Sequence, residues 1–115
     1  MIRINESISV KERDNTPVNS GLYLFYGNIA IAKDNVNDMW FIDVSVLAFE
    51  NIGYAVKMKY SRGYAISLSE DKIKSRYHFK VTDQELKGNN ILKLIDDKIK
   101  IELDKIFSPS NVVIV

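Results

Sequence analysis

The sequence predicts an α+β fold, in which a mainly antiparallel β-sheet of about five to seven strands packs on one C-terminal amphipathic helix. Two patterns predict it. Apolar and polar residues alternate in short runs through most of the chain, and an apolar stripe with helical spacing follows near the C-terminus. The 115 residues, of which 46% are hydrophobic, suffice to build one core without disulfides. We therefore expect residues 1–115 to form a single domain.

The N-terminal third predicts a strand, a loop and a hairpin. Residues 1–10 alternate isoleucine and valine with polar residues, which is typical of a half-buried strand. Residues 11–20 are polar and contain a proline, so they are expected to form a loop. Residues 22–26 and 29–32 are two short apolar runs, and Gly27-Asn28 between them predicts a tight hairpin turn.

The middle of the chain predicts further strands. Residues 39–49 are almost continuously apolar, and their β-branched and aromatic side chains favour a buried strand over a helix. Within this run, Trp40 and Phe41 are expected in the core, because large aromatic side chains dominate small cores. Alternation then returns in three runs, residues 54–61, 64–68 and 76–81. Three antiparallel strands in a β-meander are the simplest structure for these runs.

A short helix and a long helix are predicted next. Thr82-Asp83-Gln84-Glu85 has the spacing of a capping box, and Gly88 ends the short helix that begins there. Apolar residues then recur at spacings of three and four, namely Leu92, Ile95, Ile99, Leu103 and Ile106. This stripe indicates an amphipathic helix. Because residues 98–103 also alternate as a strand would, strands over residues 91–107 stay open as the alternative.

The C-terminus predicts a last strand. Pro109 ends the preceding element, and residues 111–115 are mostly β-branched and apolar. An apolar strand has to be covered. It either completes the sheet within the chain or pairs with the sheet edge of another chain, and the second alternative would give a homo-oligomer.

The charge of the chain is concentrated in its middle. Residues 54–82 carry seven basic residues and two acidic ones, a net +5, although the whole chain has a formal net charge of only +1. Alternation predicts that several of these cations share one polar sheet face with the only histidine. The candidate partner-binding residues are Lys57, Lys59, Arg62, Tyr64, Arg76, His78 and Lys80. Such a face would attract an acidic protein surface or phosphates. The alternative is that these cations only protect exposed sheet edges.

No sequence pattern indicates catalysis, a cofactor or a metal. The chain has no cysteine, and it lacks a His-Glu-x-x-His motif, a phosphate-binding glycine loop and a Gly-x-Ser-x-Gly motif. His78 is expected to be a surface residue of the basic cluster. Four acids near the C-terminus are expected on a solvated helix face rather than around a cation, namely Asp96, Asp97, Glu102 and Asp104. We expect a protein that is not an enzyme and needs no cofactor.

Two short segments resemble the signature strands of RNA-recognition-motif domains. Leu24-Phe25-Tyr26-Gly27-Asn28-Ile29 is similar to the shorter signature, and Arg62-Gly63-Tyr64-Ala65-Ile66 is similar to the start of the longer one. The resemblance implies that Phe25 and Tyr64 stack on bases and that Arg62 contacts phosphate. It also implies a helix directly after the first signature strand, where residues 39–49 instead predict a strand.

The sequence supports two functional hypotheses. The first is a small non-enzymatic intracellular binding module, which belongs to a phage or mobile element and inhibits or modulates a host protein by occupying its surface. Abundant isoleucine (15), lysine (12) and asparagine (10) fit the AT-rich coding sequence of such a source. The second hypothesis is a protein that binds single-stranded RNA or DNA through the basic sheet face. No signal peptide or membrane span is indicated, so a cytoplasmic location is expected.

Overall fold

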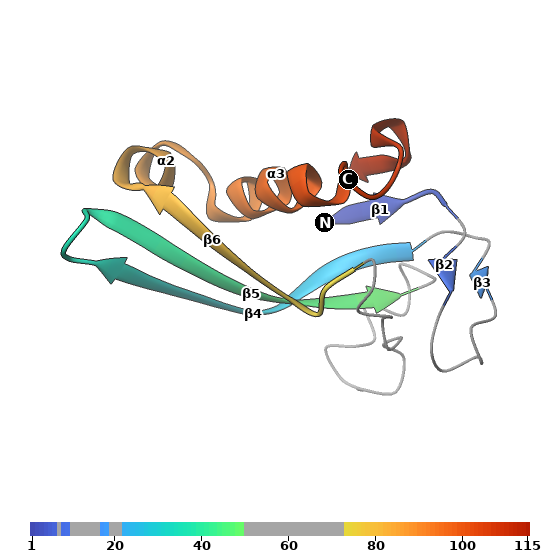
Figure 1. Ribbon diagram of the computed structural model, residues 1–115, viewed down its shortest axis with the longest axis horizontal. Coiled ribbons are helices and arrows are strands. Elements are labelled where there is room, and N and C mark those ends of the chain that lie inside the picture. Colours follow the sequence, from blue (N-terminus) through green and yellow to red (C-terminus); the bar gives the residue numbers. More distant parts are fainter. Residues whose placement is uncertain (7, 10–16, 19–21, 50–72) are drawn as a thin grey trace.

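The computed structural model describes residues 1–6, 8–9, 17–18, 22–49 and 73–115 (Figure 1). Its elements in chain order are β1 (Ile2–Ile4), β2 (Ile8–Ser9), β3 (Pro17–Val18), β4 (Leu22–Asp34), β5 (Met39–Phe49), β6 (Arg76–Thr82), α2 (Asp83–Gly88), α3 (Ile91–Leu103), a 3₁₀ turn (Pro109–Asn111) and β7 (Val112–Ile114). The predicted α+β fold with a mainly antiparallel sheet is confirmed. The predicted strands over residues 54–61 and 64–68 lie outside the described residues.

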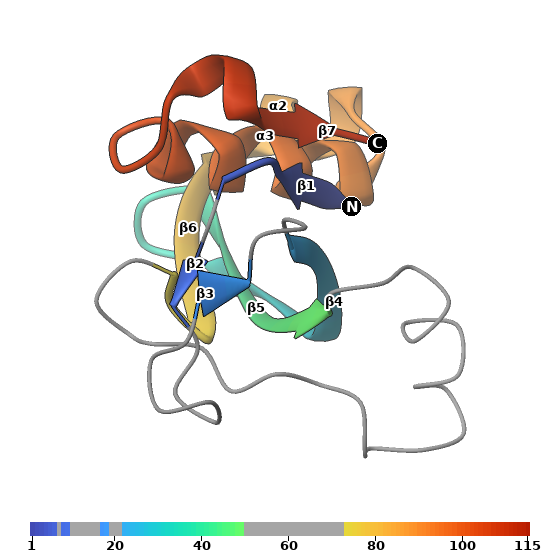
Figure 2. The ribbon, with the colours of Figure 1, turned by 90° about the vertical axis from the view of Figure 1, so that its right-hand side faces the viewer.

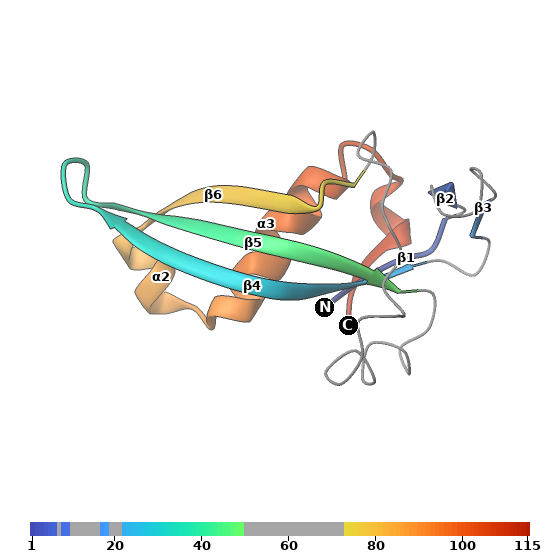
Figure 3. The same ribbon diagram turned by 90° about the horizontal axis from the view of Figure 1, so that it is seen from below.

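Five strands form one antiparallel sheet in the order β6-β5-β4-β1-β7. The long hairpin of β4 and β5 is its centre; β6 pairs with the first half of β5, and β1 pairs with the first residues of β4. The sheet curls from β4 toward β1 and β7, and the helices lie on its concave side (Figure 2). Viewed from below, α3 crosses diagonally behind β4, β5 and β6 (Figure 3).

The N-terminal residues form more strands than the alternation predicted. The expected strand over residues 1–10 is divided into β1 and β2, which belong to different sheets. Part of the expected loop over residues 11–20 is strand β3, which pairs with β2. Two-residue strands carry too little alternation to be recognised in a sequence.

The predicted hairpin turn at Gly27-Asn28 is wrong. Strand β4 runs through these residues, and the pairing with β5 shifts by one residue there, which is a β-bulge. The backbone N–H of Asn28 donates to Oγ of Ser45 on β5 at 2.7 Å. The actual turn is residues 35–38, where Asp38 has a φ of 53° and Asp34 accepts hydrogen bonds from the backbone of the turn. Glycine and asparagine serve bulges as well as turns, so this pair of residues alone does not distinguish the two.

The core lies between the concave side of the sheet and α3. Alternate residues of β5 are buried, namely Ile42, Val44, Val46 and Ala48, and they face the buried side chains of the helix, Leu94, Ile95, Ile99 and Leu103. The helix is therefore confirmed over the alternative of strands, because Ile101 between two buried residues is 55% exposed. The prediction of an apolar stripe on this helix is wrong for the first and the last of its residues. Leu92 and Ile106 are exposed, because Leu92 lies in the first turn of α3 and Ile106 beyond its last residue.

The C-terminal strand pairs within the chain. Strand β7 runs antiparallel to β1, and the N–H of Val115 donates to the carbonyl of Met1 at 3.0 Å. Lys100 of α3 reinforces this corner, since its Nζ donates to the carbonyls of Pro109 and Val112 at 3.2 and 2.9 Å. Of the two alternatives for this strand, pairing within the sheet of the same chain is the one observed.

The predicted capping box begins α2. The Thr82 hydroxyl accepts from the N–H of Glu85 at 3.1 Å, and the Glu85 carboxylate accepts from the N–H of Thr82 at 3.3 Å. These reciprocal bonds satisfy two donors that the first turn of a helix leaves unpaired. The box fixes where β6 ends, and it turns the chain from the sheet into the helical layer.

Candidate functional site

Three of the predicted binding residues meet on the convex side of the sheet, away from the helices. Arg76, His78 and Lys80 alternate along β6 and are exposed, while Tyr77 is buried and Phe79 is half-buried between them, and Val81 after them is buried. For these three residues the structure agrees with the alternation, which predicted them on one polar face. The other candidates, Lys57, Lys59, Arg62 and Tyr64, lie outside the described residues.

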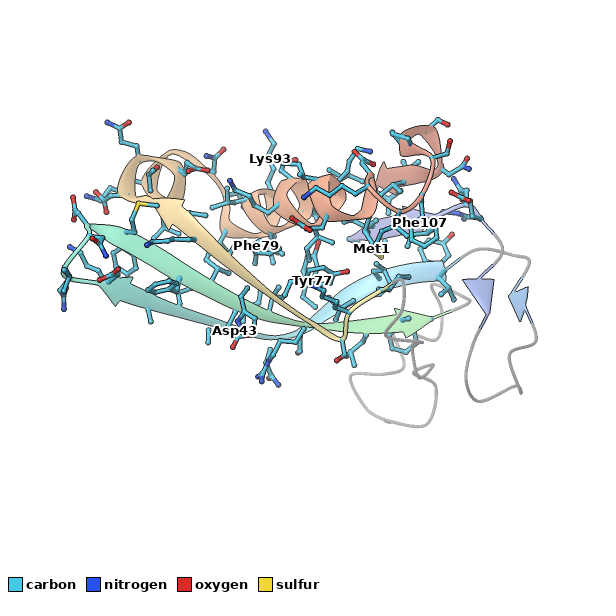
Figure 4. The ribbon with its side chains drawn as sticks, in the orientation of Figure 1. Met1, Asp43, Tyr77, Phe79, Lys93 and Phe107 are labelled. Atoms are coloured by element: carbon cyan, nitrogen blue, oxygen red, sulfur yellow. The ribbon has the colours of Figure 1, made fainter. Side chains whose placement is uncertain are left out.

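An acidic residue that the sequence reasoning missed lies among these cations. Asp43 of β5 is paired in register with His78; its Oδ1 is 3.1 Å from Nε of Arg76, and its Oδ2 is 3.7 Å from Nδ1 of His78. Figure 4 shows Asp43 on the side of the sheet away from α3, whereas Tyr77 and Phe79 lie between sheet and helix. Alternation within residues 39–49 could have placed Asp43 on the polar face, but only the strand register brings it to Arg76 and His78.

An exposed aromatic ring lies beside Lys80. Phe41 is 45% exposed, and Nζ of Lys80 is 5.6 Å from the centre of its ring. On β4, its neighbour in register is only Ala32, which leaves the ring uncovered. The expectation that Phe41 belongs to the core is wrong, because Ile42 and alternate residues of β5 face the helix and Phe41 therefore faces the opposite way. Trp40 is half-buried, and its indole N–H donates to Asp83 at 2.9 Å.

We call the surface formed by Phe41, Asp43, Arg76, His78 and Lys80 the convex patch. It is of mixed charge rather than purely basic, since Asp43 pairs with Arg76. A second carboxylate, Asp34, lies on the same side of the sheet. Hydrogen bonds from Asn37 and Val36, together with the charge of Lys80, hold the pKa of Asp34 below its ordinary value, so it is ionised at neutral pH.

A pocket of about 320 Å³ opens beside the patch at the outer edge of β6. It is lined by Lys74, Arg76, Tyr77, His78, Phe79 and Glu102. The rings of Tyr77 and Phe79 are stacked with centres 6.1 Å apart, and burial raises the pKa of the Tyr77 phenol. The pocket thus combines charged side chains with two aromatic rings.

The described residues do not form a metal centre, since no group of three or more histidine or acidic side chains is placed to hold an ion. The expected solvated helix face is wrong for Asp96, which is only 7% exposed. Its Oδ1 is 2.9 Å from the α-amino group of Met1 and accepts a hydrogen bond from the hydroxyl of Tyr26. Burial, followed by the hydrogen bond and the charge of Asp96, raises the pKa of Tyr26. These contacts anchor β1 and β4 to α3 and are structural.

The fold implied by the RNA-recognition-motif resemblance is not observed. Residues Met39–Phe49 form strand β5, where that family has its first helix. Phe25 does not present a free stacking surface either. It is half-buried, and its ring contacts the ring of Phe49 edge-on with centres 5.7 Å apart. Tyr64 and Arg62, which the resemblance also assigns, lie outside the described residues.

Comparison of the chain with protein-family models, with curated proteins and with solved structures finds no match. None of the helices in the described part of the chain is long and apolar enough to span a membrane.

Proposed function

We propose that the chain is a non-catalytic protein-binding module of the cytoplasm, and that its convex patch docks on a partner protein. The observation that carries the proposal is the exposed ring of Phe41 among charged side chains of both signs. Aromatic residues and arginine are enriched where protein interfaces gain most of their binding energy. In keeping with its small size and composition, we propose that it is a phage or mobile-element protein that inhibits or modulates a host protein by covering part of its surface.

The mixed charge of the patch favours a protein over a nucleic acid as the partner. A phosphate backbone offers only negative charge and hydrogen-bond acceptors, so Asp43 and Asp34 would repel it. A protein surface offers carboxylates to Arg76 and Lys80 and also N–H donors to Asp43. The partner surface is therefore expected to be acidic on balance and to carry a recess for Phe41.

Affinity capture with matched variants tests the proposal. The wild-type chain, Phe41→Ser, Lys80→Glu and Lys93→Glu are each immobilised and exposed to lysate of the source organism. Lys93 is the control because it projects from α3 on the side away from the sheet (Figure 4). One protein should be retained by the wild type and by Lys93→Glu, and lost from both patch variants. Retention that is equal for all four chains contradicts the proposal.

Binding to labelled single-stranded RNA and DNA, measured by fluorescence anisotropy across a salt series, tests the competing function. If the chain is a protein-binding module, the wild type should bind these RNA and DNA oligomers no more tightly than Lys80→Glu does at any salt concentration. Micromolar affinity that falls steeply with salt and is lost in Lys80→Glu, but kept in Lys93→Glu, would overturn the protein proposal in favour of single-strand binding.

A further inference from the structure

The outer edge of β6 has no strand beside it in the described part of the chain. Strand β6 is the last in the order of the sheet, and β5 pairs with it on one side only. In Figure 3 it forms the upper border of the sheet, and α3 crosses behind it, in the helical layer. An extended segment added to this edge would therefore lie in the layer of the sheet, with the end of α3 behind it.

The strand register shows which backbone groups of β6 point away from the sheet. The N–H of Val46 donates to the carbonyl of Ser75, so odd-numbered residues of β6 direct their N–H and C=O groups toward β5. The even-numbered residues direct theirs outward, namely Arg76, His78 and Lys80. The capping box agrees with this assignment, because the N–H of Thr82 points outward as well and donates to Glu85.

The residues with outward backbone groups carry basic side chains on the convex side. The side chains of Arg76 and His78 are 61% and 71% exposed, and Lys80 is exposed too. Asp43 lies beside Nε of Arg76, but a guanidinium has further N–H groups that can bind a second carboxylate. Directly opposite residues of antiparallel strands share a face, so acidic residues of an added strand would meet these basic side chains. A second copy of β6 would instead oppose basic residues to basic residues, which is unfavourable.

On the concave side, the same edge borders the pocket of about 320 Å³. Its lining includes Tyr77 and Phe79, which lie between sheet and helix, and Glu102 of α3 (Figure 4). Side chains of an added strand alternate between the two faces, so those between the acidic residues would point to this side. Phe79 is only half-buried, and Glu102 already pairs with Lys105 at 3.3 Å. An apolar side chain at this place would remove more of the Phe79 ring from water.

We propose that β6 binds an extended segment of the partner protein as an added antiparallel strand, and that acidic and apolar residues alternate in this segment. The proposal rests on the proposed function and adds to it the chemistry of the partner. The acidic residues lie opposite Arg76, His78 and Lys80 and exchange backbone hydrogen bonds with them. The apolar residues lie opposite Tyr77 and Phe79. Backbone bonds supply affinity in this mode of recognition, and the alternate side chains supply specificity.

Fluorescence anisotropy with labelled synthetic peptides tests the proposal on the wild-type chain. The probe is Glu-Val-Glu-Val-Glu with capped ends. The control peptide, Glu-Glu-Glu-Val-Val, has the same composition and charge without the alternation. The chain should bind the probe at least about tenfold more tightly than the control peptide. Equal affinity for the two peptides, or no binding of the probe up to about 1 mM, overturns the proposal.

N-methylated peptides test the backbone hydrogen bonds directly. In the proposed register the glutamates direct their N–H groups toward β6, and the valines direct theirs away from it. A methyl group on the nitrogen of the central glutamate removes the donor to the carbonyl of His78, so binding should be lost. The same methyl group on a valine nitrogen should leave binding unchanged. Equal effects at the two positions contradict strand addition.

Variants of the chain link the probe to the edge of β6. Lys80→Glu should weaken binding of the probe at least about tenfold, and the control Lys93→Glu should bind it like the wild type. The peptide comparisons on the wild-type chain stay decisive if Lys80→Glu does not fold. They are also separate from the affinity capture. A captured partner that is lost from Phe41→Ser and Lys80→Glu, without any binding of the probe, overturns strand addition and leaves the proposed function standing.

Discussion

At the scale of single residues, Gly27 shows how the bulge constrains the sequence. A Cβ at this position would lie 2.8 Å from Oγ of Ser45 and 3.3 Å from Cδ1 of Leu47. Because Ser45 already accepts from the N–H of Asn28, it cannot move without breaking that bond. We expect Gly27→Ala to lower the free energy of unfolding by about 1–2 kcal/mol, measured by urea denaturation.

Gly88 provides the matched control for that substitution. It is the last residue of α2, and a Cβ there has no neighbour within 4 Å. Gly88→Ala should be neutral or stabilise the protein by up to about 1 kcal/mol, because alanine favours the helix and restricts the unfolded chain. Equal effects of the two substitutions would mean that the contact with Ser45 does not restrict Gly27.

Single residues also show where sequence reasoning fails. Phe41 lies in an apolar run, but which of the two faces of this strand packs on the helix depends on elements far away in the chain. Asp96 has a sequence neighbour, Asp97, that is exposed, and only the approach of Met1 and Tyr26 makes Asp96 a buried partner. Asp43 joins the candidate site for the same kind of reason, since strand pairing brings it to Arg76.

At the scale of elements, the predictions that succeeded rest on local chemistry. The capping box of α2, the strand over Arg76–Thr82 and the helical period of α3 each depend on residues close in sequence. The turn prediction at Gly27-Asn28 failed because a bulge requires the same small and polar residues. A strand that continues past such residues is recognisable only when its partner strand is known.

The start of α2 is expected to make stability dependent on pH. The ion pair with Lys98, at 2.9 Å, and the bond from the Thr82 backbone hold the pKa of Glu85 below its ordinary value of 4.5. A carboxyl group whose folded pKa is lowered stabilises the protein above the ordinary value, and this contribution is lost as the pH falls through the lowered pKa. Glu85→Gln, which can keep the capping box, should therefore cost stability near pH 7 and much less near pH 3.

Urea denaturation at both pH values measures that difference. Repeating it in a Lys98→Met background isolates the ion pair, because the cost of Glu85→Gln should shrink when its main partner is absent. A cost that is the same near pH 7 and near pH 3 would show that the charge of Glu85 does not contribute to stability.

At the scale of the whole molecule, α3 holds the curled sheet together. One side of the helix packs on the hairpin strands. Near the end of the helix, Lys100 donates to the carbonyl of Val112 in β7 and to that of Pro109 just before this strand. No helix of the described residues lies on the convex side of β4 to β6, so the same curl that builds the core also presents the convex patch. Composition alone could not predict this division, because an apolar strand can be buried on one side or on both.

The unequal exposure of neighbouring isoleucines on α3 gives the most direct test of this architecture. Ile99 is fully buried in the core that joins sheet and helix, whereas Ile101 is 55% exposed. We expect Ile99→Ala to lower the free energy of unfolding by about 2–5 kcal/mol, since it removes buried methyl groups and leaves a cavity. Ile101→Ala should change it by less than about 0.5 kcal/mol. Both values come from urea denaturation followed by circular dichroism. Comparable losses for the two variants would favour the alternating strand that residues 98–103 also permit, because Ile99 and Ile101 would then share one buried face.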